Sequence, residues 1–210
     1  MMQPDLFGAA RDDIVLSTGA LFLPGFAVAE VVTLLAHIRT IAVCSPFRHM
    51  ITPGGRRMSV AMTSCGRFGW TSGREGYGYT SHDPDSGQAW PLMPPVFREL
   101  ARKAATRAGF ADFSPDTCLV NRYAPGTRLS LHQDLDEGDM SAPIVSVSLG
   151  LPAIFLWGGP MRSDTRRRIM LHEGDVMVWG REARMNFHGV EPLPPGNGTC
   201  RYNLTFRKAR

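Results

Sequence analysis

The sequence predicts an α+β fold whose core is a jelly roll, a pair of antiparallel sheets packed face to face. Three observations support this: two helical patterns in the first half of the chain, a loop-rich region between them, and short strand patterns after Cys118. Residues 118–207 contain strand patterns with no helical period between them. We therefore expect N-terminal helices packed on one sheet, a loop-rich lid, and a β core at 118–207.

The predicted elements can be placed by residue number. Apolar residues recur at helical spacing over 29–43, and again from Pro94-Pro95 to the stop at Gly109. The Gly- and aromatic-rich region 52–90 begins with a turn at Thr52 and a strand at 58–63. Later strands are predicted at 118–123, 144–150, 154–157, 168–172, 175–179 and 202–207. Glu173-Gly174 is predicted to be a hairpin turn.

Length and composition favour one soluble domain, and we expect a monomer. The chain has 210 residues, 43% of them hydrophobic and 20% charged, which is enough to bury a sizeable core. No apolar run approaches the roughly 18 residues of a membrane span, and the first residues lack a secretory signal pattern. We expect a cytoplasmic protein with a single domain over 1–210, a flexible tail at 1–15 and a lid region at 45–92.

The charge balance is mildly basic. The net charge is +4, and of the 23 Lys and Arg residues all but Lys103 and Lys208 are Arg. A GC-rich coding sequence would explain this preference. The planar guanidinium group also suits phosphate and carboxylate ligands, so the composition is compatible with an anionic partner without requiring one.

His132-Gln133-Asp134 is the first candidate for chemistry. In an extended backbone, residues two apart project to the same face, so an imidazole and a carboxylate converge there. That pair suits a metal ion. Because a His-x-acid triplet is common by chance, a solvated loop histidine remains an alternative at this point.

The last predicted strand has a polar face and an apolar face. Its period of two places Arg201, Asn203, Thr205 and Arg207 on one side and Tyr202, Leu204 and Phe206 on the other. Inside a narrow barrel, two unpaired guanidinium groups would be costly, so the polar face predicts an anionic ligand. An edge strand with a solvated arginine face is the alternative.

Two further segments complete this pattern. Asn121 and Tyr123 share one face of a predicted strand and can both donate hydrogen bonds to a carboxylate. His188 is a candidate third metal ligand. Two imidazoles and one carboxylate on one side of a metal form the facial triad of non-haem iron(II) oxygenases, which leaves three positions for a 2-oxo acid and dioxygen.

In this order, the motifs resemble the AlkB family of iron(II)- and 2-oxoglutarate-dependent nucleic-acid dealkylating dioxygenases. The resemblance rests on His132-x-Asp134, His188 and Arg201-x-Asn203-x-Thr205-x-Arg207, with Asn121 to Gly126 upstream. Segments 45–48, 52–55, 58–63, 143–152 and 200–207 are also similar, so the resemblance covers nearly the whole chain.

The resemblance implies a cofactor set and a reaction. His132, Asp134 and His188 map onto the Fe(II) ligands. The residues that map onto the 2-oxoglutarate site are Asn121, Tyr123, Arg201, Asn203, Thr205 and Arg207, with Arg201 favoured for the distal carboxylate. With O2, 2-oxoglutarate is converted to succinate and CO2, and an N-alkyl group on a base such as 1-methyladenine or 3-methylcytosine is hydroxylated and leaves as an aldehyde.

The resemblance also implies a base pocket. Trp70 and Tyr77 resemble the lid residues that sandwich a flipped base, with His132 on its other side, while Asp136 resembles the acid that reads the exocyclic amino group. Arg162 maps onto a further pocket contact, and weaker candidates are Thr52, Tyr79, Arg128 and Glu137. Leu135 departs from the pattern, because a basic residue is expected between the two acids. The expected substrate is alkylated DNA, preferentially single-stranded, or RNA.

Two other functions remain open from the sequence. A 2-oxoglutarate oxygenase acting on a protein or small molecule needs the same triad but no aromatic clamp, so Trp70 and Tyr77 discriminate. A non-catalytic jelly-roll binding module would not consume 2-oxoglutarate. Separately, Gln3 to Phe7 resembles a peptide that docks on the replication sliding clamp, although Leu6 and Phe7 can equally pack a chain end against the domain.

Overall fold

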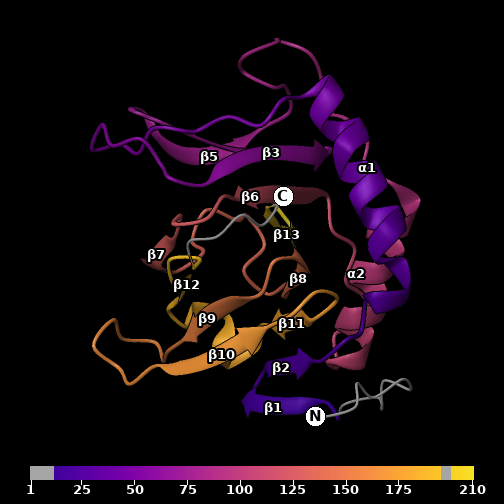
Figure 1. Cartoon of the computed structure of the whole chain (residues 1–210), viewed down its shortest axis with the longest axis vertical. Coiled ribbons are helices and arrows are strands. Elements are labelled where there is room, and N and C mark those ends of the chain that lie inside the picture. The colour runs from indigo at the N-terminus through magenta and orange to yellow at the C-terminus, as the bar shows by residue number, and fades with distance from the viewer. Residues whose placement is uncertain (1–11, 195–199) are drawn as a thin grey trace, which may run out of the picture.

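The computed structural model describes residues 12–194 and 200–210 and contains two large antiparallel sheets (Figure 1). The seven-stranded sheet has the order β1 (Ile14–Ser17), β2 (Ala20–Leu23), β11 (Val176–Trp179), β8 (Ile144–Gly150), β13 (Arg201–Arg207), β6 (Thr117–Tyr123), β3 (Ala61–Gly66). The four-stranded sheet has the order β10 (Arg167–Leu171), β9 (Ala153–Trp157), β12 (His188–Val190), β7 (Leu129–His132). A separate hairpin consists of β4 (Gly69–Gly73) and β5 (Gly76–Thr80). The predicted jelly-roll core is confirmed.

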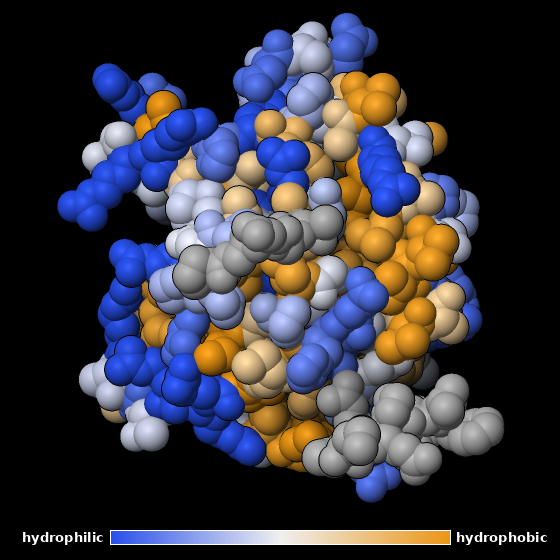
Figure 2. All heavy atoms as spheres, viewed as in Figure 1, coloured by the Kyte–Doolittle hydropathy of each residue, from blue (hydrophilic) through white to orange (hydrophobic). Residues whose placement is uncertain are grey.

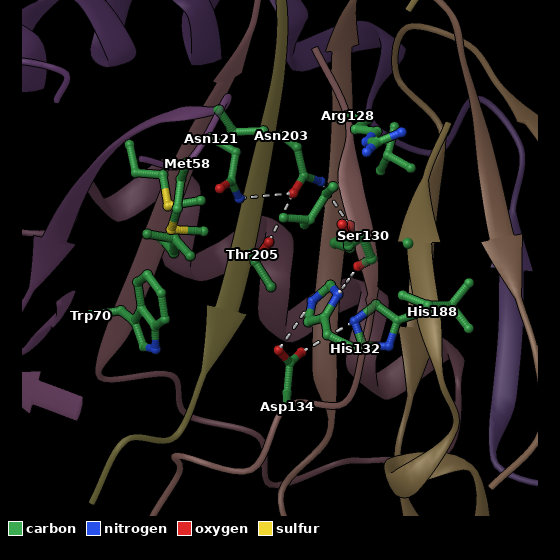
Figure 3. Close-up of a pocket in the computed structure, with 18 of the residues that line it drawn as sticks. Met58, Trp70, Asn121, Arg128, Ser130, His132, Asp134, His188, Asn203 and Thr205 are labelled. Carbon is green, nitrogen blue, oxygen red and sulfur yellow. Dashed lines mark hydrogen bonds and ion pairs between the residues drawn. The ribbon is translucent and has the colours of Figure 1, made fainter. Parts of the chain in front are cut away.

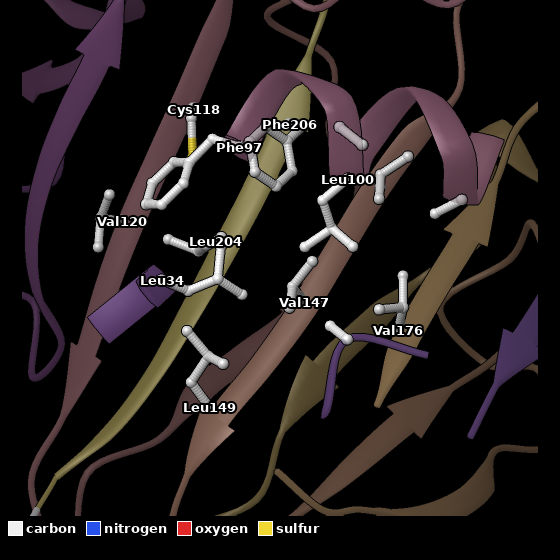
Figure 4. Close-up of a cluster of buried hydrophobic side chains, with 14 of the residues drawn as sticks. Leu34, Phe97, Leu100, Cys118, Val120, Val147, Leu149, Val176, Leu204 and Phe206 are labelled. Carbon is white, nitrogen blue, oxygen red and sulfur yellow. The ribbon is translucent and has the colours of Figure 1, made fainter. Parts of the chain in front are cut away.

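Both helices cover the same face of the seven-stranded sheet. They are α1 (Val31–Cys44), preceded by the short 3-10 helix η1 (Val28–Glu30), and α2 (Pro95–Arg107). Leu34 of α1 and Phe97 and Leu100 of α2 pack with Leu204 and Phe206 of β13 (Figure 4). The periodic apolar positions predicted from the sequence are therefore the buried ones. Neither helix is long and apolar enough to cross a membrane, and the described residues contain no other candidate span.

β13 lies between β8 and β6 and carries the alternation predicted for it. Leu204 pairs with Val147 on one side and Val120 on the other, and all three side chains face the helices. The intervening residues of β13 point to the opposite face, toward the four-stranded sheet. A second apolar cluster between the sheets includes Phe155, Trp157 and Trp179. The polar face of β13 therefore borders a space that side chains fill only in part.

The predicted hairpin at Glu173-Gly174 is wrong. β10 belongs to the four-stranded sheet and β11 to the seven-stranded sheet, so this turn carries the chain from one sheet to the other. Asp175 holds the crossing, because its carboxylate accepts hydrogen bonds from the backbone N–H groups of His172 and Gly25, each 2.7 Å long. Gly174 has φ +83°, and a Cβ there would lie 2.5 Å from Val28 Cγ2. The local turn signal was correct, but it does not specify which strands pair.

The N-terminal half contributes more strands than expected. β1 and β2 extend one edge of the seven-stranded sheet beside β11, and β3 extends the other beside β6. The helices therefore do not simply precede the β core. β1 begins at Ile14, inside the stretch expected as a tail, because Ile14 pairs with Phe22. The strand predicted at 58–63 lies at Ala61–Gly66 and belongs to the core sheet, not to a lid.

Candidate active site

Three side chains that can bind a metal converge at one end of the space between the sheets. His132 ends β7, Asp134 follows two residues later, and His188 begins β12. They meet because β7 and β12 pair with His132 directly opposite His188. The potential ligand atoms lie within 4.8 Å of one another (Figure 3). Nε2 of His132 is 3.7 Å from Oδ1 of Asp134, and Nε2 of His188 is 3.5 Å from Oδ2.

Hydrogen bonds fix which nitrogen of each imidazole faces the centre. Nδ1 of His132 donates to the carbonyl of Ser130 at 2.8 Å, and Nδ1 of His188 donates to the carbonyl of Asn186 at 3.1 Å. Nε2 of each ring is left to bind a metal. Burial in the pocket, together with repulsion from His188, lowers the pKa of His132 to about 4. His132 is therefore neutral near pH 7, as a metal ligand must be.

Asp134 is held as a carboxylate by Arg207. Nη2 of Arg207 donates to Oδ1 of Asp134 at 2.9 Å, and both side chains are buried. Burial alone would raise the pKa of Asp134, but the guanidinium group outweighs it and holds the pKa well below its usual range. Oδ2 is buried and accepts no hydrogen bond from the described residues. The carboxylate thus presents one free oxygen toward the two imidazoles.

A second buried arginine, Arg184, supports Asp134 from behind. Its Nη1 donates to the backbone carbonyl of Asp134 at 2.8 Å, and its Nη2 donates to Oε2 of Glu137 at 2.8 Å. Oε1 of Glu137 accepts the hydroxyl of Tyr79 at 2.6 Å and lies 3.3 Å from Nε of Arg207. Asp134 is therefore held at its backbone and at its carboxylate. Sequence reasoning missed Arg184, because an arginine in a 3-10 helix gives no signal of burial.

The polar face of β13 continues away from the metal ligands to Arg201. Arg201 is 1% exposed, and it forms no ion pair with any described residue. Its Nη2 donates to Ser148 Oγ at 3.0 Å, but Nε and Nη1 are buried without a hydrogen-bond acceptor. Its guanidinium group lies 4.9 Å from the centre of the Tyr123 ring. A buried cation with two free donors is costly unless an anion completes the site.

The other residues expected at this end are brought together. Asn121 donates to Oδ1 of Asn203 at 3.2 Å, and Thr205 donates to the same oxygen at 2.9 Å. Asn203 in turn donates to Ser146 Oγ at 2.7 Å. Oδ1 of Asn121 is buried and free. β6 and β13 thus present an amide network beside the metal ligands (Figure 3).

These residues line a pocket of about 620 Å³ with an aromatic pair on its wall. Trp70 of β4 and Tyr77 of β5 stack with ring centres 5.6 Å apart and planes at 17°. Nε1 of Trp70 donates to Oδ2 of Asp136 at 2.8 Å, which ties the hairpin to the segment that carries Asp134. Thr52, Arg128, Leu135 and Asp136 also line the pocket.

Three of the expected pocket contacts do not line it. Tyr79 and Glu137 lie behind the wall, where they bond each other and Arg207. Burial raises the pKa of Tyr79, so its hydroxyl stays protonated and donates. Arg162 donates to the carbonyl of Leu131 at 3.0 Å and covers the ring of Phe187. Leu131 belongs to β7, so Arg162 contacts the strand of His132 from outside.

The donor set fits Fe(II) and a dicarboxylate 2-oxo acid. Two neutral imidazoles and one carboxylate on one side of a metal leave open positions for a chelating ligand and O2. The free donors of Arg201 and the free oxygen of Asp134 are the orphaned polar atoms that such ligands would complete. A jelly roll with this site defines the class of non-haem iron oxygenases that use a 2-oxo acid.

The comparisons with known proteins agree. The family model of the 2OG-Fe(II) oxygenase superfamily matches residues 19–207. The alpha-ketoglutarate-dependent dioxygenase AlkB of Escherichia coli is 55% identical over 210 residues, covering 98% of this chain and 97% of that protein. The tRNA demethylase abh1 of Schizosaccharomyces pombe is 35% identical over 143 residues, covering 67% of this chain and 46% of that protein. The solved structure of OsALKBH1 superposes with a TM-score of 0.81 at 28% identity, covering 94% of this chain and 100% of that one.

The chain belongs to the AlkB family of 2OG-Fe(II) oxygenases. It is an Fe(II)-dependent dioxygenase with 2-oxoglutarate and O2 as cosubstrates. The resemblance, the fold class, the enzyme class and the cofactors inferred from the sequence are thereby confirmed.

Proposed function

We propose that this chain repairs alkylated nucleic acid by oxidising N-alkyl groups on damaged bases such as 1-methyladenine and 3-methylcytosine. The observation that carries the proposal is the stacked pair Trp70 and Tyr77 on the wall of the pocket that contains His132, Asp134 and His188. A flat aromatic ligand fits beside such a pair, and a base flipped out of its strand is one.

The base is held on three sides. Trp70 and Tyr77 cover one face of the ring, and His132 covers the other while it binds the metal through Nε2. Asp136 accepts Trp70 through Oδ2, and its Oδ1 has no partner among the described residues, so this oxygen is available to the exocyclic amino group of the base. These contacts direct the alkyl group toward the metal ligands.

The cosubstrate lies along β13. We assign the distal carboxylate to Arg201, because its Nε and Nη1 are free, and the carboxylate beside the keto group to Arg207, which lies next to Asp134. Asn121, Tyr123, Asn203 and Thr205 surround the chain between them. Two arginines match the two charges of the ligand.

When bound, iron and 2-oxoglutarate supply the oxidising power for C–H hydroxylation, with O2 consumed and succinate and CO2 released. The residues of this chain bind, orient and enclose the reactants. The C–N bond of the hydroxylated alkyl group then breaks: the carbon leaves as an aldehyde, the nitrogen keeps the bonding electron pair, and the hydroxyl proton is released. The base is restored without breaking the strand.

The fission yeast relative named a tRNA demethylase supports RNA as well as DNA as the substrate class. A single strand is the preferred form, because flipping a base then requires no unpairing. We further propose that the chain acts as a monomer in the cytoplasm. The peptide Gln3 to Phe7 lies outside the described residues, and docking on a sliding clamp stays a prediction from the sequence.

The direct test is mass spectrometry of a 1-methyladenine or 3-methylcytosine oligonucleotide after incubation with protein, Fe(II), ascorbate and 2-oxoglutarate. We expect the mass of one methylene group to be lost, and no loss when 2-oxoglutarate is left out. An intact methylated strand, with 2-oxoglutarate consumed, would instead favour an oxygenase acting on a protein or small molecule.

The role of Trp70 can be separated from that of the iron site. Trp70→Ala should weaken binding of the methylated strand by about 1 to 3 kcal/mol of lost stacking. The turnover of 2-oxoglutarate in the absence of nucleic acid should persist, because Trp70 contacts neither the metal ligands nor Arg201. If that turnover disappears together with binding, Trp70 is a core residue and the clamp is wrong.

A further inference from the structure

Three arginines line the same pocket without a partner. Arg56, Arg57 and Arg128 are exposed, and none of their side chains forms a hydrogen bond or ion pair with the described residues. Some other exposed arginines of the chain are neutralised, such as Arg102 by Glu99 and Arg168 by Glu191. The sequence had indicated Arg128 only as a weak candidate and had not singled out Arg56 or Arg57.

The backbone of this rim is ordered by hydrogen bonds. The backbone N–H of Thr52 donates to the carbonyl of Arg56, and that of Met58 donates to the carbonyl of Met50, each at 2.8 Å. Ser59 follows this hairpin, and its hydroxyl donates to the carbonyl of Arg128 at 2.9 Å. The bond from Ser59 therefore joins the hairpin to the loop that carries Arg128. We define the arginine rim as Arg56, Arg57 and Arg128.

The acids of the pocket leave this rim unneutralised. The carboxylate of Asp134 pairs with Arg207, and Asp136, which accepts a hydrogen bond from Trp70, forms no ion pair with a described arginine. Arg128 and Asp134 lie at opposite ends of the pocket (Figure 3). Hydrophilic side chains also project at the upper left of Figure 2, above the loops beside β3 and β5 in Figure 1. The rim is thus an exposed surplus of positive charge at the pocket.

Residues 134–136, which line the pocket at the end away from Arg128, offer no such positive charge. Leu135 lines the pocket between Asp134 and Asp136 and is 55% exposed. An exposed leucine offers apolar contact to a sugar or a neighbouring base, but it offers nothing to a phosphate. The surface around the pocket is therefore electrostatically asymmetric.

We propose that the arginine rim binds backbone phosphates on one side of the flipped nucleotide, so that the chain selects a polynucleotide strand over a free nucleoside. This inference rests on the proposed function. Arginine binds phosphate oxygens through parallel N–H donors, and a strand that enters the pocket through one base must carry phosphodiesters past its edge. Because Leu135 offers nothing to a phosphate, the phosphate contacts lie on one side of the pocket only.

The test compares two double variants that remove the same charge. Arg56→Ala/Arg57→Ala alters the rim, whereas Arg39→Ala/Arg98→Ala alters exposed positions on α1 and α2, away from the pocket. Binding of a 1-methyladenine single strand is measured by fluorescence anisotropy over a range of salt concentrations. Turnover is measured on the same strand, on the 5′-mononucleotide and on 1-methyladenosine.

The rim variant should bind the strand about tenfold more weakly at low salt, and its slope of log K against log[salt] should fall by roughly 1.4, which is 0.7 for each of two phosphate contacts. The ratio of kcat/KM for the strand to that for the nucleoside should fall by a similar factor, and Arg56→Lys/Arg57→Lys should recover part of the salt slope. The α1/α2 variant should keep the wild-type slope.

Equal salt slopes in the rim variant and the wild type, with methylated strands still repaired, would overturn the phosphate rim but not the proposed function. Equal losses for the mononucleotide and the strand would assign the rim to a terminal phosphate instead of a phosphodiester. Failure of the wild-type chain to repair any methylated strand would refute the proposed function itself.

Discussion

The two faces of β13 share one backbone but follow different rules. Toward the helices, Leu204 and Phe206 are fully buried among apolar side chains of α1 and α2. Toward the pocket, Arg201 is equally buried but has two donors without acceptors. The first face lowers the free energy of folding by removing apolar surface from water. The second raises it, because a buried charge without a counterion is unfavourable.

This difference separates stability from function within seven residues. A strand that only had to fold would carry apolar side chains on both faces, as buried strands usually do. The pocket face is tolerated because the helix face and the rest of the core stabilise the strand. Unsatisfied polar atoms in a well-packed barrel therefore mark the place where a ligand belongs.

The largest effect is expected at the metal ligands. His132→Ala should abolish the consumption of 2-oxoglutarate, because two remaining ligands do not hold Fe(II) on one face. The variant should stay folded, since the His132 side chain is 32% exposed to the pocket. Activity and circular dichroism together check this.

His172→Ala is the matched control, because His172 is exposed and lies outside the pocket. It should retain wild-type turnover. Full activity of the His132→Ala enzyme would remove the assignment of the triad.

The next effect concerns the two arginines, which should behave differently. Arg201→Ala should raise the KM for 2-oxoglutarate by at least a hundredfold, since loss of one partner of a buried charge pair costs about 3 to 5 kcal/mol. The free energy of unfolding without ligand should not fall, because Arg201 has no anionic partner to lose. Arg207→Ala should raise the KM and also destabilise the protein, because it leaves the buried carboxylate of Asp134 without its guanidinium partner and removes one of the two arginines beside Glu137.

Chemical denaturation of both ligand-free variants, with cosubstrate kinetics, measures these quantities. Similar losses of stability in the two variants would contradict the claim that Arg201 is held for a ligand.

On the helix face of β13, substitutions should instead change the free energy of unfolding. Leu204→Ala should lower the free energy of unfolding by about 3 kcal/mol, because it opens a cavity between β13 and the helices. Thr205→Ala, one residue further, removes a hydrogen bond to Asn203 and should cost about 1 kcal/mol. Denaturation midpoints provide the comparison, and equal losses would show that the two faces are not separated as described.

An effect smaller than that of Leu204→Ala lies outside both faces, where Asp83 joins the end of α1 to the loop after β5. Burial opposes its ionisation, but hydrogen bonds from Arg48 and Ser45 hold the pKa of Asp83 at about 2, below its ordinary 3.8. A lowered pKa stabilises the fold above pH 3.8, and this contribution is lost as the pH falls to about 2. Asp83→Asn should therefore cost about 2 kcal/mol at pH 7 and flatten the acid limb of the stability curve. If the stability of the wild type and of Asp83→Asn fell equally steeply at low pH, the role given to Asp83 would be contradicted.

The sequence predicted those parts of the fold that depend on local periodicity. The alternation in β13 is a local property, and so are the apolar stripes of α1 and α2. Pairing is not local, and for this reason Glu173-Gly174 was mistaken for a hairpin. The short strands β7 and β12 gave too few residues for a period, although they position His132 and His188.

The candidate site was also predicted only in part. Residue types with a distinctive chemistry, such as His132 and Arg201, could be identified from spacing and from the family resemblance. Residues that act through others could not. Arg184 reads as a surface charge, and only the fold shows that it holds the backbone of Asp134. Tyr79 and Glu137 were expected at the pocket wall, but they lie behind it because they neutralise and bond the arginines there.

The central claim is that one pocket couples the oxidation of 2-oxoglutarate to the removal of an alkyl group from a base. The measurement that tests it most directly is the ratio of formaldehyde to succinate released by the wild-type enzyme from a 1-methyladenine single strand. We predict one formaldehyde for each succinate formed in excess of the rate without nucleic acid, and no formaldehyde without O2 or 2-oxoglutarate. Succinate formed at the same rate with and without the strand, and no formaldehyde, would contradict the account.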